Sequence, residues 1–130
     1  MSQENVELIR RGNDAFRRKD WKAFEEIADP HISLRMDPRW PEQRAYGREA
    51  AINFYREASA SGGSDLRIED IVDLGDRVLF RLCWHMRGSQ SGLAGEQRYS
   101  IISTIREGRI ILEEFFLDHA EALKAVGLAE

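Results

Sequence analysis

The second half of the chain contains four apolar segments joined by short turns. These segments span residues 66–74, 77–87, 97–106 and 109–117. Gly75-Asp76 separates the first two and is a two-residue hairpin signal of the glycine-first kind. A looser Gly/Ser turn, residues 88–95, joins the middle pair, and Glu107-Gly108 joins the last two. The pattern predicts four antiparallel strands, and the sheet that they form needs other elements to cover one face.

Helical patterns supply that cover. Apolar residues recur at three- and four-residue spacing in the first thirty residues, which predicts two short helices. Asp20 can cap the second of them, and Asp29-Pro30 ends it, because proline disfavours the helical region for the residue before it. A third helix is predicted after Gly47, ending at residues 61–64, and a short fourth helix in residues 118–127.

Residues 31–37 change to an alternating pattern. Ile32, Leu34 and Met36 alternate with polar residues, which predicts a strand with two different faces. Asp37-Pro38 stops this strand, and residues 38–47 are predicted to form a loop. The order is therefore helix, helix, strand, helix and four strands, and the absence of a repeat or linker predicts one domain over residues 1–130.

Composition narrows the classes of partner. The 130 residues are 42% hydrophobic and 32% charged with a net charge of -4, as in an ordinary soluble globular protein. Acidic and basic residues are interleaved, so no nucleic-acid binding is expected. Cys83 is the single cysteine and the three histidines are not closely paired, so no disulfide, metal site or cofactor is expected. With no signal-peptide pattern and no long apolar run, the expectation is a cytoplasmic protein that does not contact membranes.

Several short motifs, in their order and spacing, resemble one known family. They are the opening helix pair of residues 6–21, the Asp37-Pro38 and 46–55 stretches, the hairpin of residues 104–110 and the tail of residues 118–128. The chain is similar to SnoaL-like polyketide cyclases of the nuclear transport factor two-like superfamily, which includes ketosteroid isomerases. The resemblance implies an α+β fold in which a cone-shaped, curved, mainly antiparallel sheet packs on N-terminal helices, with a short C-terminal helix. It also implies an apolar pocket and a homodimer formed through the sheet.

Asp37 is the first candidate catalytic residue. It falls where the isomerases of this superfamily carry the carboxylate that moves a proton, and a carboxylate at the mouth of an apolar pocket can act so if its pKa is raised. The alternative is that Asp-Pro simply starts a turn. The isomerases also need an oxyanion hole, but its positions fall at Gly12 and near Ile101, which have no side-chain donor. The resemblance therefore does not imply a steroid isomerase mechanism.

Tyr55 and Glu113 are the other candidate catalytic residues. Phe54-Tyr55 matches a pair that lines the family's pocket, and the alternative for Tyr55 is a core aromatic residue. Glu113 and Glu114 lie in an apolar strand, so one points inward and one outward, and by register Glu113 is the inward one. An inward carboxylate must be paired or protonated, with Arg98 or Arg35 as candidate partners. A register error of one residue would exchange Glu113 for Glu114.

Apolar residues of the predicted pocket come from the loop, the third helix and the strands. The candidate ligand-binding residues are Trp40, Phe54, Phe80, Leu82, Trp84, Met86, Ile101, Ser103 and Phe115. Strand alternation separates Phe80, Leu82, Trp84 and Met86 from Arg81, Cys83 and His85, which would face solvent or a second subunit. The capping context of Asp118 favours a structural role for that residue.

Two classes of function follow. The first is an isomerase or cyclase that acts on a small apolar molecule by proton transfer without a cofactor, with Asp37 as base and Tyr55 or Glu113 as donor. The alternative is a non-catalytic ligand-binding or homodimerisation domain. An epoxide hydrolase is not favoured, because Ser100 stands where an aspartate would be needed. The superfamily contains both enzymes and proteins without catalysis, so the fold alone does not decide between them.

Overall fold

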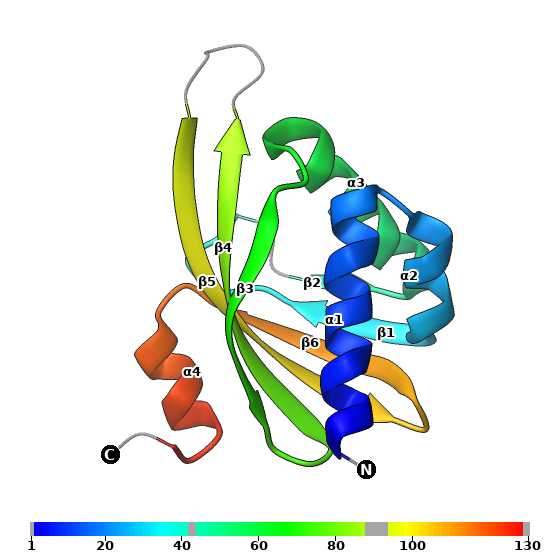
Figure 1. The fold of residues 1–130 in the computed structure, drawn as a ribbon, viewed down its shortest axis with the longest axis vertical. Coiled ribbons are helices and arrows are strands. Elements are labelled where there is room, and N and C mark those ends of the chain that lie inside the picture. Colours follow the sequence, from blue (N-terminus) through cyan, green and yellow to red (C-terminus); the bar gives the residue numbers. More distant parts are fainter. Residues whose placement is uncertain (1, 42–43, 88–93, 129–130) are drawn as a thin grey trace.

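The computed structural model describes residues 2–41, 44–87 and 94–128. They form four helices and one six-stranded sheet (Figure 1). The helices are α1 (Ser2–Arg18), α2 (Trp21–Ile27), α3 (Arg48–Gly62) and α4 (His119–Ala125). The strands are β1 (Ala28–Arg35), β2 (Arg44–Tyr46), β3 (Leu66–Asp73), β4 (Arg77–Arg87), β5 (Ala94–Arg106) and β6 (Arg109–Phe116).

The sheet has the order β2-β1-β6-β5-β4-β3. All neighbouring strands are antiparallel except β1 and β6, which run parallel. Helices α1, α2 and α3 cover one face of the curved sheet, and α4 lies on the other (Figure 1). The predicted α+β fold, a curved, mainly antiparallel sheet packed on N-terminal helices, is confirmed.

The local signals explain most element boundaries. The Asp20 carboxylate accepts the Ala23 N–H at 3.1 Å and so caps α2, as predicted. Two boundaries differ from the prediction. Asp29-Pro30 does not separate helix from strand, because β1 already begins at Ala28. The predicted loop contains the short strand β2, which pairs with the end of β1. Most of the predicted turn at residues 88–95 lies outside the described residues.

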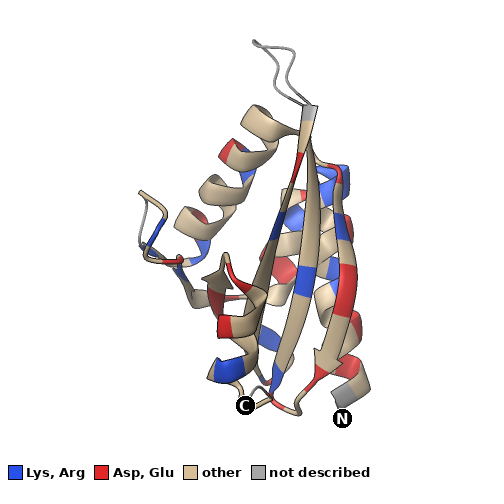
Figure 2. Ribbon diagram, turned by 90° about the vertical axis from the view of Figure 1, so that its left-hand side faces the viewer, with Lys and Arg blue, Asp and Glu red and all other residues tan. Residues whose placement is uncertain are grey.

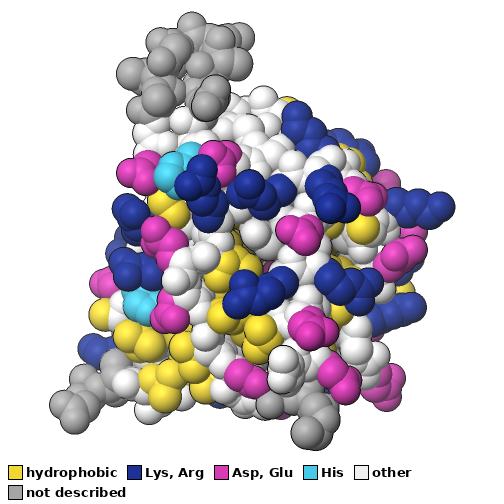
Figure 3. Space-filling view, viewed as in Figure 1, with side chains coloured by type: hydrophobic (Ala, Val, Ile, Leu, Met, Phe, Trp, Pro, Cys, Tyr) yellow, Lys and Arg dark blue, Asp and Glu magenta, His cyan; other side chains and the backbone are white. Residues whose placement is uncertain are grey.

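The main core lies between α1–α3 and the sheet. It contains Phe16, Phe24, Ile32, Phe80 and other buried apolar residues. A second, smaller core lies under α4, where Ala122 packs against Leu79 and Ile102. Figure 2 shows acidic and basic residues distributed along the helices and strands. In Figure 3, positively and negatively charged side chains are interleaved on one face of the surface. Within the described residues, no helix combines the length and apolar character needed to span a membrane.

The end of α3 is fitted closely to a tryptophan of β4. Trp84 donates its indole N–H to the Gly63 carbonyl oxygen at 3.0 Å, and its ring lies against Gly62. A Cβ atom on Gly62 would clash with the Trp84 ring, lying 2.7 Å from its Cη2 atom. Only glycine at position 62 therefore lets the end of α3 approach the Trp84 ring this closely.

Gly62→Ala should lower the free energy of unfolding by about 1–3 kcal/mol, because the Trp84 ring has to move to admit the methyl group. Gly95→Ala is the matched control, since nothing lies within 4 Å of a Cβ atom at that position of β5. Urea unfolding curves of both variants measure the difference. Equal stability of the two variants would contradict the close packing.

Candidate functional site

A buried carboxyl group lies at the centre of the main core. Glu113 of β6 is 4% exposed and points toward the helices. The Tyr55 hydroxyl on α3 donates a hydrogen bond to one of its oxygens at 2.5 Å, and the Ser103 hydroxyl donates to the other at 3.1 Å. Ser103 and Glu113 are directly opposite in the β5–β6 register, which explains their contact.

The surroundings of Glu113 change its acidity. Burial raises the pKa of Glu113, while the hydrogen bonds from Tyr55 and Ser103 act in the opposite direction. No cationic side chain pairs with Glu113 among the described residues. Burial and the neighbouring Glu113 carboxylate also raise the pKa of Tyr55. The site therefore holds a weakly acidic carboxyl group hydrogen-bonded to a phenol, which can exchange a proton with a bound molecule.

Two small apolar cavities meet at Tyr55. The first, about 40 Å³ in volume, is bounded by α1, α2, α3 and the sheet, and Glu113 lies in its wall. The second, about 50 Å³, lies between α3 and the strands on the side of the loop after β1. Phe16, Tyr55 and Tyr99 line both cavities, so their aromatic rings form the partition between them.

One polar atom in the wall of the first cavity has no partner. The Asn13 side-chain oxygen is buried and accepts no hydrogen bond within the described part of the chain. A buried acceptor without a partner is costly, and a ligand with a hydroxyl or amide donor would remove that cost. Asn13, Tyr55 and Glu113 thus give an apolar cavity three polar groups in its wall.

The structure distributes the predicted ligand-binding residues between the two cavities. Phe80, Leu82 and Ile101 line the first, and Trp40, Phe54, Trp84 and Phe115 line the second. Ser103 is buried behind Glu113 without lining either cavity, and Met86 lines neither. Tyr55 and Glu113 come together as hydrogen-bonded partners.

Asp37 lies elsewhere and is held by an arginine. Its carboxylate is 1% exposed and accepts hydrogen bonds from Arg39 Nε and Nη2, both at 2.8 Å. It also accepts the backbone N–H groups of Arg39 at 2.9 Å and Leu117 at 2.8 Å. The hydrogen bonds from Arg39 dominate and hold the pKa of Asp37 well below its usual range. Asp37 lines neither cavity, and its lowered pKa is the reverse of the raised pKa expected for a general base.

The parallel pairing of β1 with β6 explains this environment. Parallel strands end at the same edge of a sheet, so Asp37, just after β1, meets the Leu117 N–H, just after β6. Arg39 also donates to Glu121 of α4 at 2.9 Å and so extends the contact to the C-terminal helix. The geometry favours a structural role for Asp37, in which it ties the loop after β1 to the end of β6.

The predicted pairing of Glu113 with Arg35 or Arg98 is wrong. Arg35 pairs with Glu114 at 3.3 Å, and Arg98 pairs with Glu69 at 2.9 Å, both on the opposite face of the sheet. Strand alternation is the reason, because Glu114 is the outward neighbour of Glu113. Hydroxyl groups from Tyr55 and Ser103 satisfy Glu113 instead of a guanidinium group.

Several residues of the site were not singled out from the sequence. Tyr99 shares a strand face with Ile101 and Ser103, so alternation along β5 could have found it. Trp21 lies in the wall of the first cavity, but its helical spacing indicates only a core position. Arg39 follows Asp37 by two residues, and only the turn after β1 brings their side chains together.

Comparisons with known proteins identify the family of this chain. The model of the SnoaL-like domain family matches residues 9–113, so the chain belongs to this family. No curated protein matches the sequence significantly.

Solved structures share the whole fold. One is a putative SnoaL-like polyketide cyclase from Jannaschia sp. CCS1, with 19% identity, coverage of 99% of this chain and 95% of that chain, and a TM-score of 0.76. Another is an NTF2-like protein of unknown function from Mesorhizobium loti, with 22% identity, coverage of 88% and 91%, and a TM-score of 0.74. A third is TerC co-crystallized with polyporic acid, with 17% identity, coverage of 95% and 98%, and a TM-score of 0.74. At these identities the similarity shows the nuclear transport factor two-like fold.

Proposed function

We propose that this protein binds a small, ring-containing apolar molecule between α1–α3 and the sheet and transfers a proton on it, as an isomerase or cyclase without a cofactor. Glu113 is the acid–base group, and Tyr55 is the hydrogen-bond donor that orients it. The observation that carries the proposal is the buried Glu113 carboxyl group in the wall of an apolar cavity, hydrogen-bonded to a phenol and with a raised pKa.

Glu113 suits this role better than Asp37. A general acid or base works best when its pKa lies near the working pH, which requires the pKa of a carboxyl group to be raised. Burial raises the pKa of Glu113, whereas Arg39 lowers that of Asp37. Glu113 also lies beside the space that a ligand would enter, and Asp37 does not.

The cavity sizes define how a ligand would enter. A volume of about 40 Å³ holds roughly three water molecules, since one water needs about 10–15 Å³ of such space. A ring-containing ligand therefore has to occupy both cavities and move the rings of Tyr99 or Phe16 that separate them. Polyporic acid, which was co-crystallized with the related protein TerC, is a reasonable first probe.

The test is proton exchange on a carbonyl compound in D₂O. The protein is incubated with polyporic acid and with a set of apolar cyclic ketones, and native mass spectrometry identifies those that bind. We expect a bound ketone to gain deuterium at the carbon beside its carbonyl group, detected by NMR. A ligand that binds without exchange would instead support the alternative function, a non-catalytic binding domain. A Glu113 carboxyl group that ionises at or below its ordinary pKa would contradict the acid–base role.

Tyr55→Phe should move the pH dependence of exchange to higher pH. The Tyr55 hydroxyl donates to the Glu113 carboxylate and favours its ionised form, so its removal should raise the pKa of Glu113 further. The measurement is the rate of deuterium exchange from about pH 5 to about pH 8, the range in which folded proteins are usually most stable. A midpoint that stays unchanged or falls would show that Tyr55 does not act on Glu113.

Homodimerisation through the outer face of the sheet stays a prediction. The face that α4 leaves uncovered carries Arg81, Cys83 and His85, as strand alternation predicted. Analytical ultracentrifugation of the purified protein would decide between one and two chains. A dimer is compatible with either function of the cavity.

A further inference from the structure

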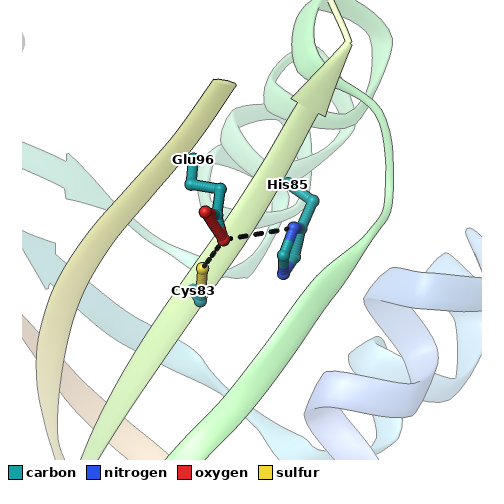
Figure 4. Close-up of side chains that lie close together, drawn as sticks. All are labelled: Cys83, His85 and Glu96. Carbon is teal, nitrogen blue, oxygen red and sulfur yellow. Dashed lines mark hydrogen bonds and ion pairs between the residues drawn. The ribbon is translucent and has the colours of Figure 1, made fainter. Parts of the chain in front are cut away.

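Three side chains with metal-binding atoms meet on the outer face of the sheet. Cys83 and His85 are two residues apart on β4, so they point to the same side, and Glu96 of β5 is directly opposite His85 (Figure 4). The Cys83 sulfur lies 3.5 Å from Glu96 Oε2, and His85 Nδ1 lies 3.5 Å from the same oxygen. All three ligand atoms lie within 4.8 Å of one another.

These separations fit a tetrahedral zinc ion. Zinc binds sulfur at about 2.3 Å and nitrogen or oxygen at about 2.0–2.2 Å, so tetrahedral ligand atoms lie roughly 3.3–3.6 Å apart. The Cys83–Glu96 and His85–Glu96 distances fall in that range, and a small rotation of a side chain would adjust the Cys83–His85 pair. Thiolate, imidazole and carboxylate are also the three side-chain ligands that zinc uses.

The neighbouring arginines do not occupy the three ligands. Arg98 makes two hydrogen bonds to Glu69, at 2.9 and 3.1 Å, and its contact to Glu96 is longer, at 3.9 Å. Arg67, which is paired with Cys83 in the register, makes two hydrogen bonds to Asp65. Both guanidinium groups are therefore committed mainly to other carboxylates, which leaves Glu96 able to bind a cation.

In a single chain, the position of the three residues also gives an ion access from solvent. The Cys83 side chain is buried, whereas the His85 and Glu96 side chains are 32% and 50% exposed. The sulfur therefore forms the floor of the site, and the other two ligands form its rim. Three protein ligands leave a fourth tetrahedral position open to water, as in zinc sites that are not fully enclosed by protein.

We infer that Cys83, His85 and Glu96 form a binding site for one Zn²⁺ ion per chain on the face of the sheet opposite the proposed active site. Binding replaces the proton of the Cys83 thiol, which passes to the buffer, while His85 binds through the lone pair of Nδ1. Burial and the nearby Glu96 raise the pKa of Cys83, so the metal has to displace that proton. This site is independent of the proton-transfer function, because none of its residues lines either cavity.

The sequence alone did not predict this site. Cys83 and His85 form a pair of ligands, which is too few for a zinc site, and Glu96 lies 11 residues after His85 along the chain. Only the β4–β5 register brings the third ligand into place. The expectation of no metal site rested on cysteine and histidine spacing and did not include this carboxylate.

The test is titration of the purified, reduced protein with Co²⁺ and then with Zn²⁺. We expect one Co²⁺ per chain with a thiolate-to-cobalt charge-transfer band, and loss of that band when Zn²⁺ displaces the cobalt. His85→Gln and Glu96→Gln should each weaken binding by more than about 10-fold, the smaller end of the loss seen when even an outer-shell partner is removed. His31→Gln, at an exposed histidine distant in sequence from the three ligands, is the matched control and should bind the metal as the wild type does.

Cys83→Ser should abolish the charge-transfer band. If this buried substitution impairs folding, His85→Gln and Glu96→Gln, at less buried positions, still test the site. Native mass spectrometry gives the number of ions per chain and the number of chains in each particle. The absence of binding, binding without a thiolate band, or equal affinity in His85→Gln and the His31→Gln control would each overturn the site.

Discussion

Glu113→Gln should slow deuterium exchange into a bound ring ketone by roughly 10²–10⁴-fold, the usual contribution of a general acid or base. Glutamine keeps the size and much of the hydrogen bonding of the side chain to Tyr55 and Ser103, but it cannot carry the proton. Glu114→Gln is the matched control, because the adjacent glutamate points to the opposite face and pairs with Arg35. The measurement is the rate of label incorporation by NMR for the three proteins.

The stability of this variant separates a loss of chemistry from a loss of fold. The pKa of Glu113 is raised in the folded protein, so the carboxyl group destabilises the fold increasingly as the pH rises through the folded-state pKa. Glutamine does not ionise, so Glu113→Gln should be at least as stable as the wild type at neutral pH. The free energies of unfolding of the two proteins should converge below about pH 4, where Glu113 is protonated in both the folded and the unfolded state. Slow exchange in a well-folded variant supports the proposal, and wild-type exchange would exclude Glu113 as the acid–base group.

Asp37→Asn should lower the free energy of unfolding by about 2–3 kcal/mol at neutral pH, because it removes a buried charge that accepts four hydrogen bonds. The asparagine amide group has one acceptor oxygen in place of two and directs N–H donors at Arg39 or at the Leu117 N–H. The measurement is urea unfolding of both proteins at several pH values. Asp70→Asn, at an exposed position of β3, is the control and should change stability by less than about 0.5 kcal/mol.

The pH dependence of this loss has a definite sign. The folded-state pKa of Asp37 is lowered, so its stabilising effect is fully present above the ordinary carboxyl pKa and is lost as the pH falls toward the folded-state value. The difference between wild type and Asp37→Asn should therefore be constant near neutral pH and shrink below about pH 4. If the variant is as stable as the wild type but loses proton exchange, then Asp37 is the base, as the sequence resemblance first indicated.

Patterns within single elements made much of this fold predictable. The spacing of apolar residues in α1 and α2 and the turns Gly75-Asp76 and Glu107-Gly108 marked helices and hairpins, because these signals involve only residues close in sequence. The three-residue strand β2 escaped prediction, since so short a segment shows no clear alternation. Residues that share a strand face were likewise predictable, and alternation placed Glu113 on the inner face.

Contacts between distant segments were not predictable in the same way. The environment of Asp37 depends on the parallel pairing of β1 with β6 and on the approach of Leu117, 80 residues along the chain. The hydroxyl partners of Glu113 come from α3 and β5, and hydrogen bonds between elements leave no periodic signal in the sequence. By its position before a proline, Asp37 thus resembled a catalytic base, whereas its hydrogen-bond partners indicate a structural role.

The parallel pairing of β1 with β6 has a consequence for the order of folding during synthesis. Strand β1 leaves the ribosome well before its parallel partner β6, because β2, α3, β3, β4 and β5 lie between them in the chain. The antiparallel β3–β4–β5 portion can assemble from contacts between neighbouring strands, and β1 can pair with β2, whereas the pairing of β1 with β6 requires the later strand. Because closing so long a loop slows folding, we expect β1 and β6 to pair late, and the cavity around Glu113 to form only when they pair.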